Sequence, residues 1–356
     1  SYTHPPGKLN LPGKLLLMKK LICIMLLCST AVQAQTQAPT DNFALVIHGG
    51  AGKIEKMSPE REKAHLDKMN EALQKGYAIL NAGGTSLDAV EAVIRILEDS
   101  PLFNAGKGAV FTNDGKNELD ASIMEGKGMN AGAVAGVRTI KNPITAARKV
   151  MEGTPHVILT GRGAEQFARQ SGLEIVDTSY FRVEEQWNQL LEIQKQEKLK
   201  NSGDTTGSVK PLDTIFLDMK FGTVGATALD KHGNLAAGTS TGGMTNKRFG
   251  RVGDSPIIGA GTYAKNATCA VSCTGHGEYF IRTSAAHEVS VLMEYKGLTV
   301  NEAAKEMIFN KVGALGGEGG VIALDNKGNI AMQFNTLGMF RGYIGKDGKA
   351  KVMIYK

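Results

Sequence analysis

Short apolar runs and helix-spaced apolar residues predict a strand and two helices near the start of the chain. Residues 43–47 are all apolar, which is typical of a strand buried on both faces. Ser58 and Pro59 then supply a helix cap and a proline suited to the first turn, and apolar residues recur at helical spacing until Gly83. A second helix is expected to be capped by Ser86 and to bury one apolar face.

The order of the later elements indicates the fold class. Residues 228–235 resemble residues 323–330, and each segment reads as a strand, a glycine-containing turn and a second strand. The other expected elements are a glycine-rich, strand-like region at 101–137 and helices over 142–151, 163–170, 285–296 and 300–309. Strands, then helices, then strands again favour helices layered on antiparallel sheets over a doubly wound parallel sheet.

A polar stretch separates the two halves of this pattern. Residues 185–220 are predicted to be a flexible linker, because 185–200 are polar and charged and 201–207 are rich in Gly, Ser and Thr. An apolar strand pattern resumes only at Thr223. A long polar segment directly before a strand that begins with threonine is a place where an internal cut would be tolerated.

The N-terminal pattern predicts a secretory signal peptide within residues 1–34. Met18-Lys19-Lys20 form a charged start, residues 21–27 form a short apolar run, and Val32-Gln33-Ala34 resemble a cleavage site. The run is too short to span a bilayer as a helix, and a disordered basic tail is the alternative interpretation. We expect export across the inner membrane to the periplasm, with a mature chain that begins near Gln35 and has no membrane-bound part.

Charge says little about partners once this segment is set aside. Residues 1–17 precede the expected start methionine and read as an over-extended reading frame. Removing residues 1–34 lowers the formal charge from +6 to +2, because it removes no acid and four lysines, Lys8, Lys14, Lys19 and Lys20. The sequence has no basic patch interleaved with aromatic residues, so nucleic acid is not an expected partner.

The two cysteines of the mature chain are expected to be buried free thiols. Cys269 and Cys273 are four residues apart in an apolar stretch. On one strand they would be roughly 13 Å apart, which is too far for a disulfide. No His/Cys cluster has metal-ligand spacing.

The segment Phe221-Gly222-Thr223-Val224-Gly225 carries the candidate chemistry. A threonine hydroxyl is a poor nucleophile unless a base lies beside it. Cleavage of the Gly222–Thr223 bond would give Thr223 a free α-amine with a pKa of roughly 7.7–8.0, which can accept the hydroxyl proton near neutral pH. Gly222 suits such a cut because it tolerates a strained backbone. Before the cut the amine is an amide, so the intact chain should be nearly inactive.

Several further motifs accompany this segment, and together they resemble one known family. The chain is similar to the plant-type L-asparaginases/isoaspartyl peptidases, which are N-terminal-nucleophile hydrolases, over nearly all of residues 43–356. The matching segments are 48–52 (HGGAG), 101–106 (PLFNAG), 118–121 (ELDA), 154–157 (TPHV), 239–247 (TSTGGMTNK), 250–256 (GRVGDSP), 272–278 (SCTGHGE) and 335–339 (NTLGM).

The resemblance implies an α+β fold, a four-layer αββα sandwich. An α subunit, residues 35–222, and a β subunit, residues 223–356, would together form one such domain. The mature protein would be a dimer of these αβ heterodimers. The activity implied is hydrolysis of the side-chain amide of L-asparagine and of β-aspartyl (isoaspartyl) dipeptides.

The resemblance also implies a role for each site residue. Arg251 would bind the substrate α-carboxylate with its forked guanidinium, and Asp254 would bind the α-ammonium. Without the motif, these two residues would read as a structural ion pair. The other matches are the nucleophile Thr223, its hydrogen-bond partner Thr241, the oxyanion hole of Thr274 and the Gly275 N–H, the pocket wall Gly277, and Asn104, which positions groups near the nucleophile. Thr241 and Thr274 read otherwise as turn residues at strand ends.

Four further polar residues near these motifs receive no catalytic role. His48 is expected to be structural, and this mechanism does not need His276. Asp120 and Glu278 are expected to be buried acids satisfied by backbone N–H groups.

A loop after the second helix resembles the alkali-cation loop of the same family. No cofactor is expected for catalysis, and the structural ion would be Na⁺ or K⁺, held by main-chain carbonyls. The matching carbonyls belong to Leu97, Glu98, Ser100, Phe103, Ala105 and Lys107. A plain loop is the alternative.

Two other functions stay open at this point. A glycosylasparaginase would suit an exported enzyme, but such enzymes typically have aspartate before the nucleophile, where this chain has Gly222. A protein that binds asparagine or aspartate and never matures is an alternative of a different class. A denaturing gel separates it from the enzyme, because only the enzyme gives two fragments.

Overall fold

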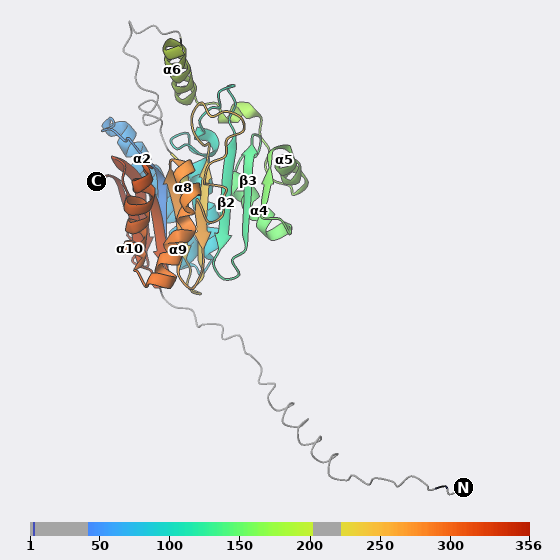
Figure 1. Cartoon of the computed structure of the whole chain (residues 1–356), viewed down its shortest axis with the longest axis vertical. Coiled ribbons are helices and arrows are strands. Elements are labelled where there is room, and N and C mark those ends of the chain that lie inside the picture. Colours follow the sequence, from blue (N-terminus) through green and yellow to red (C-terminus); the bar gives the residue numbers. More distant parts are fainter. Residues whose placement is uncertain (1–2, 4–41, 202–221) are drawn as a thin grey trace. The chain divides into compact units, whose positions relative to one another are not determined.

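The structure, a computed structural model, describes residue 3 and residues 42–201 and 222–356. Its elements lie in one compact unit, Pro39–Lys356, built around two sheets (Figure 1). The larger sheet has the order β12-β11-β1-β5-β6-β2-β3-β4, with β1 (Ala44–Gly52), β2 (Leu119–Glu125), β3 (Ala131–Val137), β4 (Ile158–Thr160), β5 (Val224–Leu229), β6 (Leu235–Thr241), β11 (Gly338–Gly345) and β12 (Lys351–Tyr355). The smaller sheet has the order β10-β9-β8-β7, with β7 (Thr262–Ala264), β8 (Cys269–Gly275), β9 (Gly319–Asp325) and β10 (Ile330–Phe334).

Helices cover the outer face of each sheet. The larger sheet contacts α2 (Pro59–Asn81), α3 (Ser86–Glu98), α4 (Pro143–Gly153) and α5 (Gly161–Gln170). The smaller sheet contacts α8 (Gly277–Thr283), α9 (Ala285–Lys296), α10 (Val300–Lys305) and the π-helical segment Glu306–Val312. Strands β1, β5 and β6 of one sheet pack on β8 and β9 of the other. The layers are therefore helix, sheet, sheet and helix, which confirms the predicted α+β sandwich.

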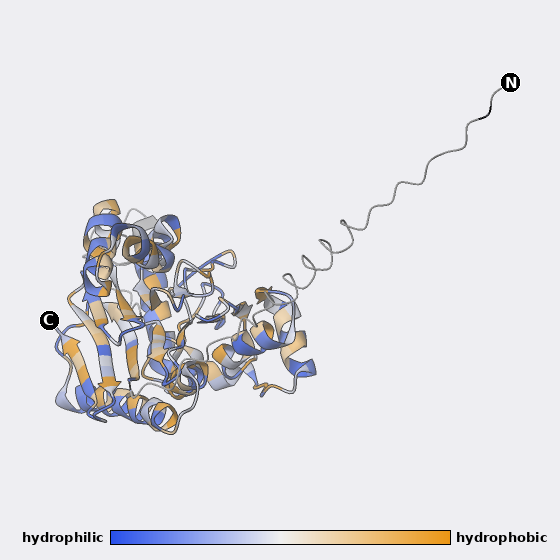
Figure 2. Ribbon diagram, turned by 90° about the horizontal axis from the view of Figure 1, so that it is seen from below, coloured by the Kyte–Doolittle hydropathy of each residue, from blue (hydrophilic) through white to orange (hydrophobic). Residues whose placement is uncertain are grey.

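The apolar residues form two cores, one on each side of the larger sheet. Leu45 and Ile47 of β1 belong to the core shared with α2 and α3. Ala44 and Val46, on the opposite face of the same strand, belong to the core between the sheets and under α9 and α10. Side chains of a strand alternate between its faces, so one apolar run supplies both cores. The helices carry apolar and polar segments in alternation, as expected for elements with one buried face (Figure 2).

The start of each of the first two helices is fixed by a side-chain cap. The Ser58 hydroxyl accepts the N–H of Arg61 at 3.3 Å, and Pro59 begins α2 as predicted. The predicted cap of the second helix is wrong by one residue. Thr85 caps α3 and accepts the N–H of Asp88 at 3.1 Å, whereas Ser86 is already helical.

The two similar segments of the sequence form equivalent hairpins. Asp230 joins β5 to β6, and its Oδ1 accepts the N–H groups of residues 232 and 234 at 2.9 and 3.0 Å. Asp325, the last residue of β9, lies at the equivalent place before β10 and accepts the N–H groups of residues 327 and 329 at 2.9 and 2.8 Å. Gly233 and Gly328 adopt positive φ angles of 76° and 87°, where glycine is favoured.

The linker prediction for residues 185–220 is wrong in its first part. Residues Glu184–Asn201 form helix α6, and its Glu197 pairs with Arg248 at 2.8 Å and accepts from the Asn246 amide at 2.9 Å. No pattern in the sequence indicated this helix, because α6 has few apolar residues and no clear apolar face. Residues 202–221 lie outside the described part of the chain, as do the predicted signal peptide and the predicted start near Gln35.

Two further findings in the described residues concern the cysteines and membrane-spanning helices. Cys269 and Cys273 lie on β8 as buried free thiols, which confirms the prediction. Burial raises the pKa of the Cys269 thiol to about 12, so it stays protonated. Among the described residues, no helix combines the length and the apolar character needed to cross a membrane.

Candidate active site

The predicted nucleophile lies at the start of β5, beside the end of β6. The hydroxyl of Thr223 donates to Oγ1 of Thr241 at 3.0 Å, and both residues are buried. Oγ1 of Thr241 also accepts the N–H of Gly243 at 3.0 Å. Pairing of β5 with β6 sets this contact, because Val224 lies opposite Ser240 in the ladder. The structure thus brings together the two threonines that the sequence analysis paired.

Asn104 holds the carbonyl of the bond that is predicted to break. Its backbone N–H donates to the Gly222 oxygen at 3.0 Å, and its backbone oxygen accepts the N–H of Gly242 at 3.0 Å. Its side-chain amide donates to the Gly243 oxygen at 2.7 Å and accepts the N–H of Val110 at 3.0 Å.

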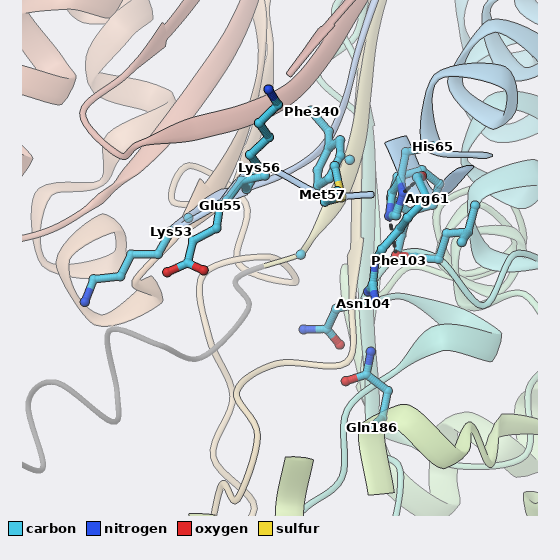
Figure 3. A pocket seen from close by; sticks show the side chains of 15 residues that line it. Lys53, Glu55, Lys56, Met57, Arg61, His65, Phe103, Asn104, Gln186 and Phe340 are labelled. Atoms are coloured by element: carbon cyan, nitrogen blue, oxygen red, sulfur yellow. Dashed lines mark hydrogen bonds between the residues drawn. The ribbon is translucent and has the colours of Figure 1, made fainter. Parts of the chain in front are cut away.

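The backbone on both sides of Asn104 approaches so closely that only glycine fits. A Cβ on Gly222 would lie 2.9 Å from Asn104 Cβ, and one on Gly242 would lie 2.5 Å from Asn104 Oδ1. Asn104 and Gly222 both line a cavity of about 540 Å³ (Figure 3). The predicted cleavage site is therefore tied to the loop that contains Asn104.

The two predicted head-group ligands converge on Gly277. A Cβ added to Gly277 would lie 2.8 Å from Asp254 Oδ1 and 3.0 Å from Arg251 Nη2. A cationic fork and a carboxylate therefore face the same small space, whose floor must be glycine. A guanidinium and a carboxylate are the two groups that would recognise an α-carboxylate and an α-ammonium on one ligand.

Arg251 does not form a structural ion pair with Asp254 in the described residues. Its Nε and Nη2 donate to Oε1 and Oε2 of Glu278, each at 2.9 Å. Glu278 is thus half-exposed and ion-paired, which corrects its prediction as a buried acid satisfied by backbone N–H groups. Burial alone would raise the pKa of Glu278, but the bonds to Arg251 outweigh it and hold the pKa below the ordinary value.

The Asp254 carboxylate is buried and incompletely satisfied. Its Oδ2 has no hydrogen-bond partner among the described residues. Burial raises the pKa of Asp254 to about 7, although Arg251 opposes the shift. Asp120 is similar: its Oδ1 accepts the N–H of Gly136 at 2.8 Å, and its Oδ2 has no hydrogen-bond partner among the described residues. The buried carboxylate of Asp254, with one oxygen unsatisfied beside the Arg251 fork, is the kind of group that a ligand ammonium would satisfy.

The predicted oxyanion-hole residues lie at the end of β8. Thr274 is fully buried, and its hydroxyl accepts the N–H of Ala51 at 3.4 Å. Gly275 has φ 144°, and a Cβ there would lie 2.4 Å from the Glu318 oxygen, so the position requires glycine. No described bond joins either residue to Thr223, and their catalytic role stays a prediction.

His48, which received no catalytic role from the sequence, contacts the nucleophile. Its Nδ1 lies 3.0 Å from the Thr223 carbonyl oxygen and its Nε2 lies 2.9 Å from Oγ of Ser272. Burial lowers the pKa of His48 to about 3, although the bond to Thr223 opposes the shift, and the ring is therefore neutral. The three residues are separated by 175 and 224 positions in the chain, so no local pattern could have revealed the contacts.

The predicted cation loop follows α3 and folds tightly on itself. A Cβ on Gly106 would lie 2.3 Å from the Glu98 oxygen, and one on Gly108 would lie 2.1 Å from the Phe103 oxygen. The backbone of this loop is thus closely packed at two of its glycines, and its role as a cation site stays a prediction. No group of three or more His, Cys, Asp or Glu side chains suited to a metal gathers in the described residues.

The buried Glu98 side chain connects this loop to two neighbouring elements. Its Oε1 accepts from the Ser240 hydroxyl at 2.6 Å and from the Ile144 N–H at 3.0 Å. Burial raises the pKa of Glu98 to about 8, although these hydrogen bonds oppose the shift.

Comparison with known proteins finds relatives over most of the chain. The family model described as Asparaginase matches residues 41–354. Isoaspartyl peptidase of Salmonella typhimurium is 50% identical over 305 residues, which cover 85% of this chain and 95% of that protein. The probable isoaspartyl peptidase/L-asparaginase 2 of Arabidopsis thaliana is 42% identical over 329 residues, with 88% and 99% covered. The plant-type L-asparaginase of Pyrococcus furiosus is 43% identical over 308 residues, with 86% and 97% covered. The chain therefore belongs to the asparaginase family.

Proposed function

We propose that this protein cleaves its own Gly222–Thr223 bond and then hydrolyses the side-chain amide of L-asparagine and of β-aspartyl peptides. The observation that carries the proposal is the geometry at Thr223. Its hydroxyl contacts Thr241 at 3.0 Å, while the preceding carbonyl is held by the Asn104 N–H at 3.0 Å.

The first step is an acyl shift from nitrogen to oxygen. The Thr223 hydroxyl oxygen bonds to the Gly222 carbonyl carbon, the C–N bond breaks, and the hydroxyl proton passes to the departing nitrogen. The Asn104 N–H, which already contacts the Gly222 oxygen, stabilises the negative charge that develops there. Water then hydrolyses the ester, leaving a carboxylate on Gly222 and a free α-amine on Thr223.

The second reaction uses the new amine as the base. The amine accepts the Thr223 hydroxyl proton as the oxygen attacks the side-chain amide carbon of the substrate. Ammonia or an amino acid leaves with that proton, an aspartyl ester forms on Thr223, and water releases L-aspartate. Thr274 and the Gly275 N–H would stabilise the oxyanion, and Arg251 and Asp254 would hold the aspartyl head group.

The relatives favour this substrate class over glycosylasparagine. Relatives that match over most of their length include proteins named isoaspartyl peptidase, L-asparaginase or both. Gly222, before the nucleophile, also differs from the aspartate typical of glycosylasparaginases. The preference between L-asparagine and β-aspartyl peptides depends on the space beyond the aspartyl group.

The test compares wild type with Thr223→Ala. We expect wild type to give two fragments that meet at Gly222/Thr223 on a denaturing gel, and Thr223→Ala to stay one chain. Steady-state rates on L-asparagine, β-Asp-Leu and GlcNAc-Asn should be measured for both. Loss of all hydrolysis in Thr223→Ala supports the proposal, whereas equal activity in the two proteins, or activity in an uncut chain, contradicts it. Predominant activity on GlcNAc-Asn would favour glycosylasparaginase.

We also propose three properties that follow from the family resemblance. The mature protein is a dimer of αβ heterodimers, the loop after α3 holds a structural Na⁺ or K⁺, and the chain is exported to the periplasm. Light scattering of the cleaved protein tests the first, and a mass of one αβ unit would contradict it.

A further inference from the structure

A chain of buried polar side chains runs between the two sheets, directly behind the nucleophile. Starting at His48 on β1, it passes to Ser272 on β8 (2.9 Å), Thr239 on β6 (2.7 Å), Thr262 on β7 (2.6 Å) and Ser122 on β2 (2.8 Å). All five residues are fully buried. Burying a polar group costs free energy unless the group is hydrogen-bonded. A connected set of five such residues between two sheets therefore indicates a functional role. We name this set the hydroxyl ladder.

The direction of the hydrogen bonds at the His48 end of the ladder follows from the Thr223 carbonyl. A carbonyl oxygen can only accept, so the Nδ1 of His48 must carry the proton that it donates to the Thr223 oxygen. The neutral ring then has a lone pair on Nε2, which accepts from the Ser272 hydroxyl. Thr262 donates to Thr239, whose own hydroxyl hydrogen has two acceptors within reach, Ser272 Oγ at 2.7 Å and the Gly261 oxygen at 3.1 Å. The Thr223 carbonyl thereby selects the His48 tautomer with the proton on Nδ1, and Ser272 supplies the donor that the Nε2 of this tautomer needs.

Gly225 leaves the room that this arrangement needs. A Cβ at Gly225 would lie 2.0 Å from Ser272 Oγ and 2.3 Å from His48 Nε2. Gly225 is two residues after Thr223 and lies opposite His48 where β1 pairs with β5. Glycine is therefore required at position 225, where the hydroxyl ladder lies against β5.

Backbone scission changes what holds Thr223. In the intact chain, the residue is tethered on its N-terminal side through Gly222, whose oxygen is bound by Asn104. After scission that tether is gone, and regular pairing of β5 begins only at Val224. After scission, the hydrogen bond from His48 to the Thr223 carbonyl oxygen restrains the backbone of the new N-terminal residue.

We propose that His48 and the hydroxyl ladder position Thr223 after the cut. They keep its amine and its hydroxyl in the places that turnover requires. This inference rests on the proposed function. His48 does not touch the reacting atoms and acts through the Thr223 carbonyl. Its removal should therefore lower kcat with little change in KM, and should affect turnover more than self-cleavage.

A pair of substitutions at His48 separates positioning from general destabilisation. His48→Asn keeps an amide donor near the place of Nδ1, whereas His48→Gln reaches the place of Nε2 and loses the donor to Thr223. We expect kcat, per cleaved protein, to fall about 10²-fold in His48→Gln and less than about 5-fold in His48→Asn, with KM within about 3-fold of wild type in both. Ser272→Ala, which removes the donor to Nε2 and so loosens the His48 ring, should lower kcat about 10-fold.

The matched control is Ser290→Ala, which removes another buried serine hydroxyl. Ser290 on α9 contacts the Thr268 hydroxyl at 2.6 Å and belongs to no part of the ladder. It should lower the melting temperature as Ser272→Ala does while leaving kcat unchanged. If His48 variants fail to fold, the comparison of Ser272→Ala with Ser290→Ala still decides.

Three results would overturn the inference. They are a wild-type kcat in folded His48→Gln, an equal loss of kcat in His48→Gln and His48→Asn, or an equal loss in Ser272→Ala and Ser290→Ala. A wild-type protein that is uncut or inactive on every substrate would instead refute the proposed function itself.

Discussion

At the scale of single residues, the ion pair between Arg251 and Glu278 shows how a charged side chain is held in place. Glu278 contacts Nε and Nη2 of the guanidinium, so the Nη1 end of the fork stays outside this pair. The ion pair fixes the plane of the guanidinium before a substrate arrives, and pre-organisation of this kind reduces the entropy lost on binding. Glu278 is thus best understood as a support for Arg251.

Asp254 predicts how activity should depend on pH. Its pKa is raised to about 7 by burial. In the proposed role, only the ionised carboxylate can bind the substrate ammonium. In the free enzyme, both Asp254 and the Thr223 amine must lose a proton, so kcat/KM should fall below pH 7 with a logarithmic slope that approaches 2. In the complex, the substrate ammonium keeps Asp254 ionised, so kcat should fall with a slope of 1. Steady-state kinetics between pH 5 and 9 measure both slopes.

Asp254→Asn provides the control for this pH dependence. Loss of one partner of a buried charge pair typically costs about 2–5 kcal/mol of binding, so kcat/KM should drop sharply. Whatever activity remains should follow a slope of 1 in kcat/KM, because only the amine then titrates. An unchanged slope of 2 in this variant would assign the second proton to another group.

At the scale of elements, the sequence predicted what is encoded locally. Ser58 with Pro59 marked the start of α2, and the glycines at 233 and 328 marked the two hairpins, because caps and positive-φ turns depend on adjacent residues. Helix α6 was missed, since its polar composition resembles a linker and its support comes from distant contacts such as Glu197 with Arg248. The threonine pair and the Arg251/Asp254 site were predicted through family motifs, whereas the bond from His48 to Thr223 joins residues too far apart for any pattern.

The loop after α3 predicts a dependence on alkali ions. It carries Asn104, which holds the Gly222 carbonyl, so an ion that stiffens this loop should support both stability and self-cleavage. Replacing Na⁺ by choline at equal ionic strength should lower the melting temperature, and a hundredfold excess of ion over its Kd should restore about 2.7 kcal/mol. Thermal unfolding and the rate of fragment formation measure the effect. Identical unfolding curves and cleavage rates in Na⁺, K⁺ and choline would contradict the proposal that this loop binds an alkali ion.

At the scale of the whole molecule, the site residues all lie within the compact unit Pro39–Lys356, so the N-terminal 34 residues should be dispensable for catalysis. If these residues are a signal peptide, a bacterial host that expresses the full sequence from Met18 should release the protein on osmotic shock, and its α subunit should begin near Gln35. A chain that starts at Gln35 should stay in the cytoplasm, with the same kcat and the same cleavage at Gly222/Thr223. Cell fractionation with N-terminal sequencing checks this, and an unprocessed, active protein in the cytoplasm would favour a basic tail over a signal peptide.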